Sequence, residues 1–448
     1  MKKTILISPI GNTDPIRNGY DGPLLHIARY YKPDKIYLIL TNEMYKNHIN
    51  DNRYVNCINQ LYYGCKDVKE DGFYGGHKKY VEICALHIDI DNPSDFEELG
   101  ALPKIIDNIF SENGNDCEYL LNITSTTQQM TSTLCVDLIY NKRNVKAVQV
   151  STPENKSNKN IPHDDGAEDN CLVNIFDSYE KTATHRCKEA ELTYLRRIFS
   201  CSEIKAFIED YNYKYASNVL DRLNYIFGDS HLISCCKIGD DYLNSNLDTI
   251  KSKCKMINFA YNMTKDETLQ DVLNAYNIMY IKEQKHLLSD FVCRLTPIFF
   301  LICKKIVNDI FDLNSVLDYK GIVLVNKLKE SAVWGAFKER LPEKDFYLSS
   351  WSLIEIYKYL HKEDEALKLM LSIRNVEELV RNKVAHSVSN LNNSRYRELA
   401  KETPKETLNK IKQLIKIAYG ENVKDDDFMF FSRLNERINN EIVTLLNV

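Results

Sequence analysis

The sequence lacks an apolar stretch of the roughly 18 residues that a membrane-spanning helix needs. Its best candidate, residues 295–307, is interrupted by Lys304 and Lys305. The apolar run at the N-terminus is broken from Pro9 onward, which makes it too short for the hydrophobic region of a signal peptide. We therefore expect a cytoplasmic protein with no membrane partner.

The motifs of several cofactor-binding classes are also missing. There is no G-x-x-x-x-G-K-[ST] and no G-x-G-x-x-G. We therefore do not expect ATP hydrolysis or NAD binding, because the phosphate-binding loops that usually serve them are missing. No C-x-x-C occurs among the thirteen cysteines, so we expect reduced, buried thiols rather than a zinc site. We expect no other metal site either, because the following residues match no compact set of metal ligands: His26, His48, His77, His87, Asp89 and Asp91.

A basic surface is absent as well, because the formal net charge is −5. This balance excludes a protein that is coated with nucleic-acid contacts. Any RNA binding must then rest on a local site, or on a groove between two subunits. We interpret the 28 tyrosines mainly as amphipathic packing residues rather than base-stacking platforms.

The first third of the chain alternates short apolar runs with segments of helical periodicity. Asp21 is expected to cap the first helix, which ends at Pro33, and Ser94 is expected to cap a later helix with Glu97 in a capping box. This alternation is typical of an α/β fold with a parallel, doubly wound sheet. The predicted strands are residues 4–7, 35–41, 84–90, 118–123 and 145–150.

The rest of the chain is predicted to be a polar loop, one further strand and then helices. Residues 151–170 are polar and predict a flexible loop, and residues 172–176 predict a sixth strand at the sheet edge. After about Ser178 the apolar residues follow helical spacing, and Pro297 with residues 309–321 suggests a boundary near 290–320. Because 448 residues exceed one ordinary core, we expect three domains. They are a sheet domain at 1–177, a helical linker at 178–300 and a helical domain at 301–448.

Two loops after predicted strands are rich in hydroxyl and amide side chains. One runs from Ser8 to Pro15 and the other from Asn122 to Met130. In an open parallel sheet, ligands bind at the carboxyl ends of the strands, where such loops meet. The same residue types also favour N-caps and turns, so the residues alone leave both interpretations open.

The hexapeptide Arg381-Asn382-Lys383-Val384-Ala385-His386 combines a permanent cation, an amide and a titratable imidazole. Those groups suit metal-free RNA cleavage, which needs a donor for the scissile phosphate and a group that passes protons near neutral pH. The pattern from residue 365 to 384 is helical, and Ser387 to Ser394 predicts its end. On an ideal helix Arg381 and His386 lie about 140° apart, so they converge only if the helix loosens or a second copy completes the site. The alternative is a solvated arginine, with a histidine that favours the helix C-terminus.

These three segments together resemble the CARF–HEPN ribonucleases of type III CRISPR systems, in particular the Csm-associated branch. The loop S-P-I-G-N-T-D-P-I-R from Ser8 to Arg17, with D-G-P-L-L after it, resembles the opening motif of that branch. The loop from Asn122 to Met130 resembles its second ligand motif, and R-N-x-x-x-H resembles the HEPN signature. The order sheet domain, helical middle and HEPN domain covers the whole chain.

The resemblance implies an endoribonuclease that cuts single-stranded RNA without a metal or cofactor. Arg381 would hold the phosphate, His386 would assist proton transfer as the 2′-hydroxyl of the RNA attacks, and Asn382 would orient these groups. The products would carry a 2′,3′-cyclic phosphate and a 5′-hydroxyl.

It also implies a homodimer whose CARF pair binds one cyclic oligoadenylate as an allosteric activator, with no stable complex with the CRISPR effector. We favour cyclic hexa-adenylate over cyclic tetra-adenylate, by analogy with the Csm branch. The expected ligand contacts are Ser8, Gly11, Asn12, Thr13, Asp14, Thr41, Thr124, Ser125, Thr126, Thr127, Gln128 and Gln129.

The second loop departs from the family, because Thr126 and Gln128 replace a glycine and a proline that are common there. A threonine does not easily adopt positive φ, so this loop is expected to differ in shape. Two alternatives stay open on the residues. One is a nucleotide-sensing dimer without nuclease activity, and the other is a CARF domain that degrades its own cyclic ligand.

Overall fold

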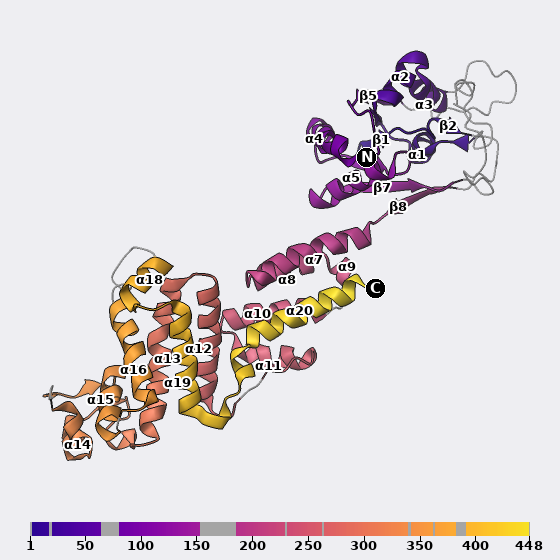
Figure 1. Cartoon of the computed structure of the whole chain (residues 1–448). Helices are drawn as coiled ribbons and strands as arrows, with labels where there is room; N and C mark the ends of the chain where they lie inside the picture. The colour runs from indigo at the N-terminus through magenta and orange to yellow at the C-terminus, as the bar shows by residue number, and fades with distance from the viewer. Residues whose placement is uncertain are drawn as a thin grey trace. The chain divides into compact units, whose positions relative to one another are not determined.

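The computed structural model describes residues 2–17, 20–63, 80–152, 185–228, 231–261, 264–338, 342–361, 363–381 and 391–447. The chain forms two compact units, Met1–Phe199 and Ser200–Val448 (Figure 1). The first unit contains β1 (Thr4–Pro9), β2 (Ile16–Arg17), β3 (Tyr20–Asp21), α1 (Pro23–Tyr31), β4 (Lys35–Leu40), α2 (Asn42–Asp51), α3 (Arg53–Tyr63), β5 (Glu82–His87), η1 (Phe96–Ala101), α4 (Leu102–Asn113), β6 (Glu118–Asn122), α5 (Gln128–Tyr140), β7 (Val145–Val150), β8 (Cys187–Ala190) and the start of α7 (Thr193–Glu209).

The second unit is helical apart from one short strand pair in the part that the structure describes. It contains α8 (Tyr213–Arg222), α9 (Asn224–Phe227), α10 (His231–Leu243), α11 (Leu247–Met256), α12 (Glu267–Gln284), α13 (Leu288–Asn308), η2 (Leu313–Ser315), β9 (Ile322–Val323), α14 (Val325–Glu330), η3 (Trp334–Phe337), β10 (Phe346–Tyr347), α15 (Ser350–Leu360), α16 (Glu365–Val376), the π-helical turn η4 (Glu377–Arg381), α18 (Asn393–Ala400), α19 (Pro404–Tyr419), η5 (Gly420–Asn422), η6 (Asp425–Phe428) and α20 (Phe430–Leu446).

The sheet of the first unit has the strand order β5-β4-β1-β6-β7-β8. The first five of these strands run parallel to one another, and the order runs outward from β1 in both directions. This confirms the predicted doubly wound α/β fold followed by a helical region. The loops after β1 and β6 leave the sheet toward opposite faces, which creates the switch point where ligands bind in such folds.

Alternate residues of each central strand enter two different hydrophobic clusters. Leu6 of β1 packs with α1 and α3, whereas Ile5 and Ile7 pack on the other face with α4 and α5. All three side chains are almost completely buried. A strand that is covered on both faces must be apolar throughout, which is why the short apolar runs in the sequence identified the central strands correctly.

The edge strand β8 was not predicted, because strand signals had been expected to end near Ser178. It pairs antiparallel with β7, with Val148 opposite Glu189 and Gln149 opposite Lys188. Its charged, exposed side chains give no apolar run, as is common for edge strands. The predicted loop at 151–170 and the strand at 172–176 fall outside the described residues, apart from Ser151 and Thr152.

The two residues predicted to cap helices in the first unit, Asp21 and Ser94, do not do so. α1 begins at Pro23 after Gly22, and Asp21 belongs to the β2–β3 hairpin, which the sequence did not predict. The cap of the 3₁₀ turn η1 is Asp95, whose carboxylate accepts from the N–H of Glu97, and not Ser94. Neighbouring polar residues compete for a cap, and the chain direction decides between them.

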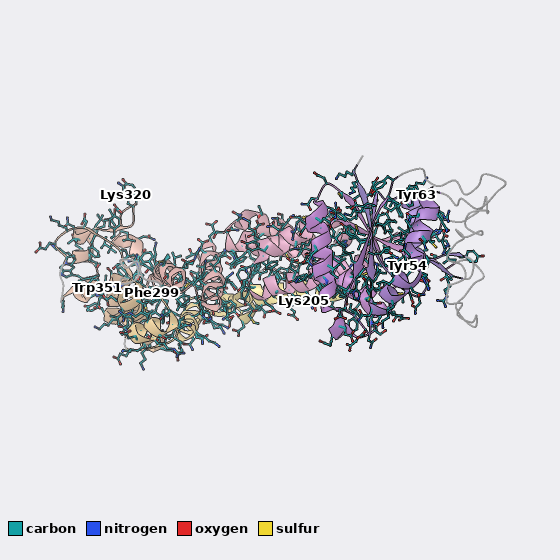
Figure 2. The ribbon with its side chains drawn as sticks, turned by 90° about the horizontal axis from the view of Figure 1, so that it is seen from above. Tyr54, Tyr63, Lys205, Phe299, Lys320 and Trp351 are labelled. Carbon is teal, nitrogen blue, oxygen red and sulfur yellow. The ribbon has the colours of Figure 1, made fainter. Side chains whose placement is uncertain are left out.

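The second unit contains two hydrophobic clusters. One is built around α12, α13, α15, α16 and α19. The other joins α8, α10 and α20, so the last helix packs with helices from the start of this unit. Figure 2 shows Phe299 among the helices, where it is fully buried, and Lys320 on an outer turn. Pro297 does not end a helix, since it lies inside α13.

Within the described residues, no helix is both long enough and apolar enough to span a membrane. The strand pair β9–β10 is a further departure from the expectation that strands end near residue 178.

Candidate functional site

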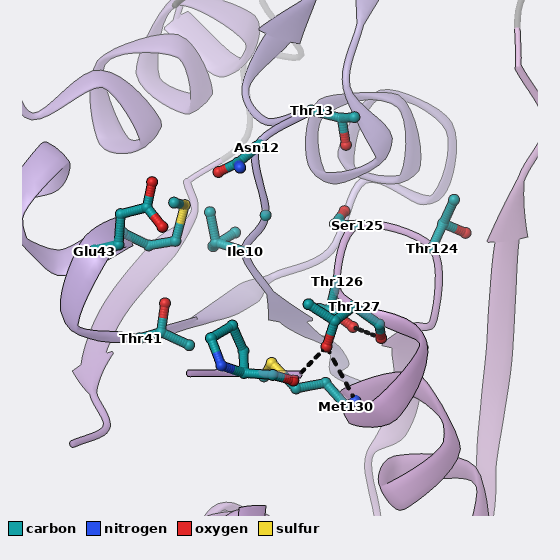
Figure 3. Close-up of a pocket in the computed structure, with 13 residues that line it drawn as sticks. Ile10, Asn12, Thr13, Thr41, Glu43, Thr124, Ser125, Thr126, Thr127 and Met130 are labelled. Atoms are coloured by element: carbon teal, nitrogen blue, oxygen red, sulfur yellow. Dashed lines mark hydrogen bonds between the residues drawn. The ribbon is translucent and has the colours of Figure 1, made fainter. Parts of the chain in front are cut away.

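A cavity of about 260 Å³ lies at the switch point of the sheet (Figure 3). It is enclosed by the segments that follow β1, β4, β5 and β6, four strands whose carboxyl ends meet at one edge of the sheet. Eight of the twelve predicted ligand residues line it, namely Gly11, Asn12, Thr13, Thr41, Thr124, Ser125, Thr126 and Thr127.

The other four predicted ligand residues do not line this cavity. Ser8 is completely buried, and its hydroxyl accepts a hydrogen bond of 3.0 Å from the amide of Asn122. Asp14 belongs to the first loop but is buried, while Gln128 and Gln129 stand on the first turn of α5. The sequence analysis missed five lining residues, which are Ile10, Glu43, Met44, Pro93 and Met130.

The two predicted loops touch each other through their backbones. Gly11 lies so close to the carbonyl oxygen of Ser125 that an added Cβ atom would overlap it. Only a glycine permits this approach, so the glycine of the first loop is required by packing. The contact joins the two halves of the doubly wound sheet at the cavity.

Asn122, at the end of β6, holds the second loop together. Its amide nitrogen donates to the hydroxyl of Ser125 at 2.7 Å as well as to Ser8, and its carbonyl oxygen accepts from the N–H of Thr124 at 3.0 Å. The hydroxyl of Thr124 in turn accepts from the N–H of Val150 on β7 at 2.9 Å. The loop is thus fixed to three neighbouring strands, β1, β6 and β7.

Thr127 lines the cavity, but its hydroxyl is already used in two hydrogen bonds within the protein. Its hydroxyl donates to the carbonyl of Pro93 at 2.5 Å and accepts from the N–H of Met130 at 3.3 Å, which caps α5. Both bonds are drawn in Figure 3. The alternative interpretation as an N-cap therefore holds for Thr127, while the loop around it still encloses the cavity.

Asp14 replaces Asp21 at the start of α1. Its carboxylate accepts from the N–H of Leu24 at 2.9 Å, and its second oxygen is buried with no hydrogen-bond partner among the described residues. Burial raises the pKa of this carboxyl from 3.8 to about 6, although its hydrogen bonds oppose that shift. Asp21 instead forms an ion pair of 2.7 Å with Arg29.

Of the predicted catalytic residues, the structure describes Arg381, and Asn382 and His386 lie outside the described residues. Arg381 is half-buried at the end of the π-helical turn η4, which continues α16. The predicted helix is therefore confirmed as far as Arg381, although a wider π-helical turn replaces the α-helix from Glu377 onward. Residues 382–384 lie outside the described residues. π-Helical turns occur frequently at functional sites.

The segment that follows begins a helix earlier than expected. Asn392 caps α18 by accepting from the N–H of Arg395 at 2.8 Å, so Asn393 and Ser394 are helical rather than part of a helix end. The π-helical turn is anchored at its other end, because Arg374 forms an ion pair of 2.6 Å with Glu377. No group of side chains in the described ranges could hold a metal ion.

An α/β unit with a cavity at its switch point, followed in the chain by a helical unit, is the arrangement of a ligand-binding domain fused to a second, helical domain. Two protein-family models match the chain, the Cas_Csm6 CARF domain over residues 81–187 and the Cas_Csm6 HEPN domain over residues 261–439. The chain belongs to the Csm6 family of CARF–HEPN endoribonucleases of CRISPR systems, which confirms the resemblance found in its sequence.

The relatives are similar over their full length. The CRISPR system endoribonuclease Csm6′ of Streptococcus thermophilus is 26% identical, covering 96% of this chain and 98% of the relative. Csm6 of Enterococcus italicus is 23% identical, covering 97% and 99%. A solved structure of Enterococcus italicus Csm6, bound to cyclic hexa-2′-fluoro-hexa-dAMP, shares the fold with a TM-score of 0.67 at 22% identity, covering 98% of this chain and 100% of that one.

Proposed function

We propose that this endoribonuclease is switched on by a cyclic oligoadenylate and then cuts single-stranded RNA in type III CRISPR defence. The observation that carries the proposal is the cavity at the switch point, where both predicted ligand loops meet. Its lining of hydroxyls, an amide and backbone groups suits the edges of a nucleotide. The analogue bound by the relative from Enterococcus italicus is a ring of six nucleotides, which supports cyclic hexa-adenylate over cyclic tetra-adenylate as the activator.

The size of the cavity supports a homodimer. Pockets that enclose a small-molecule ligand usually measure about 300–1,000 Å³, and this cavity is smaller. A ring of six nucleotides exceeds it several-fold. We therefore propose that two copies of the chain bring two such cavities to one ring across a two-fold axis, as expected from the sequence.

For the chemical step we propose the roles given by the R-N-x-x-x-H pattern. Arg381 neutralises the scissile phosphate, His386 assists proton transfer, and Asn382 orients them. The attacking group is the 2′-hydroxyl of the RNA, so the products carry a 2′,3′-cyclic phosphate and a 5′-hydroxyl, and the reaction proceeds without a metal. Ligand binding shifts the dimer toward the state in which its two HEPN sites are organised.

We further propose the division into a CARF domain at 1–177, a helical linker at 178–300 and a HEPN domain at 301–448. The protein acts in the cytoplasm as a free dimer, without a stable complex with the CRISPR effector. Because the activator, a cyclic oligoadenylate, diffuses freely, such a complex is unnecessary.

The test is cleavage of a quenched fluorescent single-stranded RNA in the presence of EDTA. Wild type and His386→Ala are each assayed with no activator, with cyclic tetra-adenylate and with cyclic hexa-adenylate. We expect cleavage by the wild type with cyclic hexa-adenylate and none by the variant. No cleavage with either ring would contradict the proposal. Linear oligoadenylates formed by His386→Ala would show that the sheet domain degrades its ligand.

A further inference from the structure

Glu43 is the one charged side chain that lines the cavity in the described part of the chain. It is exposed, and its carboxylate has no hydrogen-bond or ion-pair partner among the described residues. Figure 3 shows it beside Thr41 and Asn12, across the cavity from Thr126 and Thr127. A carboxylate is unexpected here, because the proposed ligand is a polyanion and like charges repel.

The turn that presents Glu43 is held firmly. The side-chain amide of Asn42 donates to Asp89 at 2.9 Å and to Asp91 at 2.8 Å, and its oxygen lies 2.6 Å from Nε2 of His87. The N–H of Asn42 also donates to the carbonyl of Ile90 at 3.1 Å. These contacts fix the first turn of α2, so Glu43 stands at a defined place on the wall of the cavity.

That place has a chemical meaning in doubly wound folds. Nucleotide-binding members of this class put an acidic residue beyond the first β-α unit, where its carboxylate accepts from a ribose hydroxyl. β4 follows β1 in the chain and pairs with it in the sheet, and Glu43 comes three residues after β4 ends at Leu40. Glu43 therefore occupies the position of the ribose-binding acid.

We propose that Glu43 recognises the ribose of the activator, by accepting a hydrogen bond from a 2′-hydroxyl of the cyclic oligoadenylate. This inference rests on the proposed function and adds a specificity to it. The 2′-hydroxyl is the hydrogen-bond donor of a 3′,5′-linked ribose that is not consumed by the linkage. A carboxylate accepts from it strongly, gains nothing from phosphates, and so selects ribonucleotide rings.

The experiment compares two rings that differ at the 2′ position, cyclic hexa-adenylate and cyclic hexa-2′-fluoro-hexa-dAMP, because fluorine cannot donate. Each is titrated by calorimetry into wild type, Glu43→Ala and Glu43→Gln at one ionic strength, with chromatography to verify that the ring stays intact. We expect the wild type to prefer the 2′-hydroxyl ring by about tenfold or more, the loss expected for a hydrogen bond to a charged group. Glu43→Ala should bind both rings equally, and Glu43→Gln should keep an intermediate preference.

Glu97→Gln is the matched control, since Glu97 is an exposed carboxylate of η1 that does not line the cavity. It should keep the full preference of the wild type. Tighter binding of both rings by Glu43→Ala would overturn the inference, because Glu43 would then only repel phosphates. Equal binding of the two rings by the wild type would overturn it while leaving the proposed function intact. Failure of the wild type to bind either ring would contradict hexa-adenylate sensing itself, and with it the role of Glu43.

Discussion

The backbone of Gly11 packs directly against the carbonyl group of Ser125, and this contact joins the two loops that enclose the cavity. The two residues come from opposite sides of the switch point, after β1 and shortly after β6. Any change at this contact must therefore move one ligand loop relative to the other.

Gly11→Ala should separate the loops, because its methyl group would overlap the Ser125 oxygen. We expect a loss of about 1–3 kcal/mol in the free energy of unfolding, typical of overpacking, and weaker binding of cyclic hexa-adenylate. Urea unfolding and calorimetric titration measure the two effects. Gly100→Ala is the control, since nothing lies within 4 Å of a Cβ atom there. Equal behaviour of the two variants would show that the loops tolerate the separation.

Asp14 should make stability depend on pH in an unusual direction. Because burial raises its pKa from 3.8 to about 6, the folded state keeps a proton that the unfolded state releases between about pH 4 and 6. Its contribution to stability is thus highest at low pH and falls as pH rises through that window. Asp14→Asn does not titrate and keeps an oxygen for the N–H of Leu24.

The free energies of unfolding of wild type and Asp14→Asn are to be compared from pH 4 to pH 7.5. The difference, wild type minus variant, should fall by up to about 3 kcal/mol over this range, since one pKa unit corresponds to about 1.4 kcal/mol. A difference that stays constant with pH would mean that the carboxyl titrates normally.

Thr127→Val should weaken the fold around the cavity. The variant keeps the shape but loses the hydroxyl that caps α5 and bonds to Pro93. Loss of an N-cap typically costs about 0.5–2 kcal/mol, so a lower midpoint of urea unfolding is expected. Thr127→Ser keeps the hydroxyl and should restore most of that loss. If serine and valine behaved alike, the methyl group rather than the hydroxyl would be what matters.

Arg381→Lys should lower the rate of RNA cleavage by about tenfold or more while leaving the affinity for cyclic hexa-adenylate unchanged. Lysine keeps the charge but lacks the planar fork that binds two phosphate oxygens at once. Cleavage under saturating activator measures the rate. Arg395→Lys is the control, because Arg395 on α18 makes an exposed ion pair of 2.6 Å with Glu398, which contributes little. Comparable activity of the two variants would argue against a role for Arg381 at the phosphate.

The loops that enclose the cavity were predictable because they follow apolar strands directly and are unusually polar. Glu43 and Met44 were not, because they stand in a helix that ordinary patterning treats as surface, and Pro93 is an unremarkable turn residue. Their proximity to Asn12 and Thr126 depends on strand order, which local sequence does not encode. The hexapeptide could likewise be found by its residue types, whereas the π-helical turn that ends at Arg381 could not, since the spacing of its apolar residues also fits an α-helix.

By itself, the amino-acid sequence determined that this protein is an α/β sheet domain followed by helices, because strands buried on both faces must be apolar throughout. It also determined the family, through residue types at defined spacing. Only the tertiary structure decided which side chains share the cavity, and that Asp14 rather than Asp21 receives the N–H of Leu24. The reason is physical: propensity and patterning act between neighbours in the chain, whereas a site is assembled where the carboxyl ends of separate strands meet.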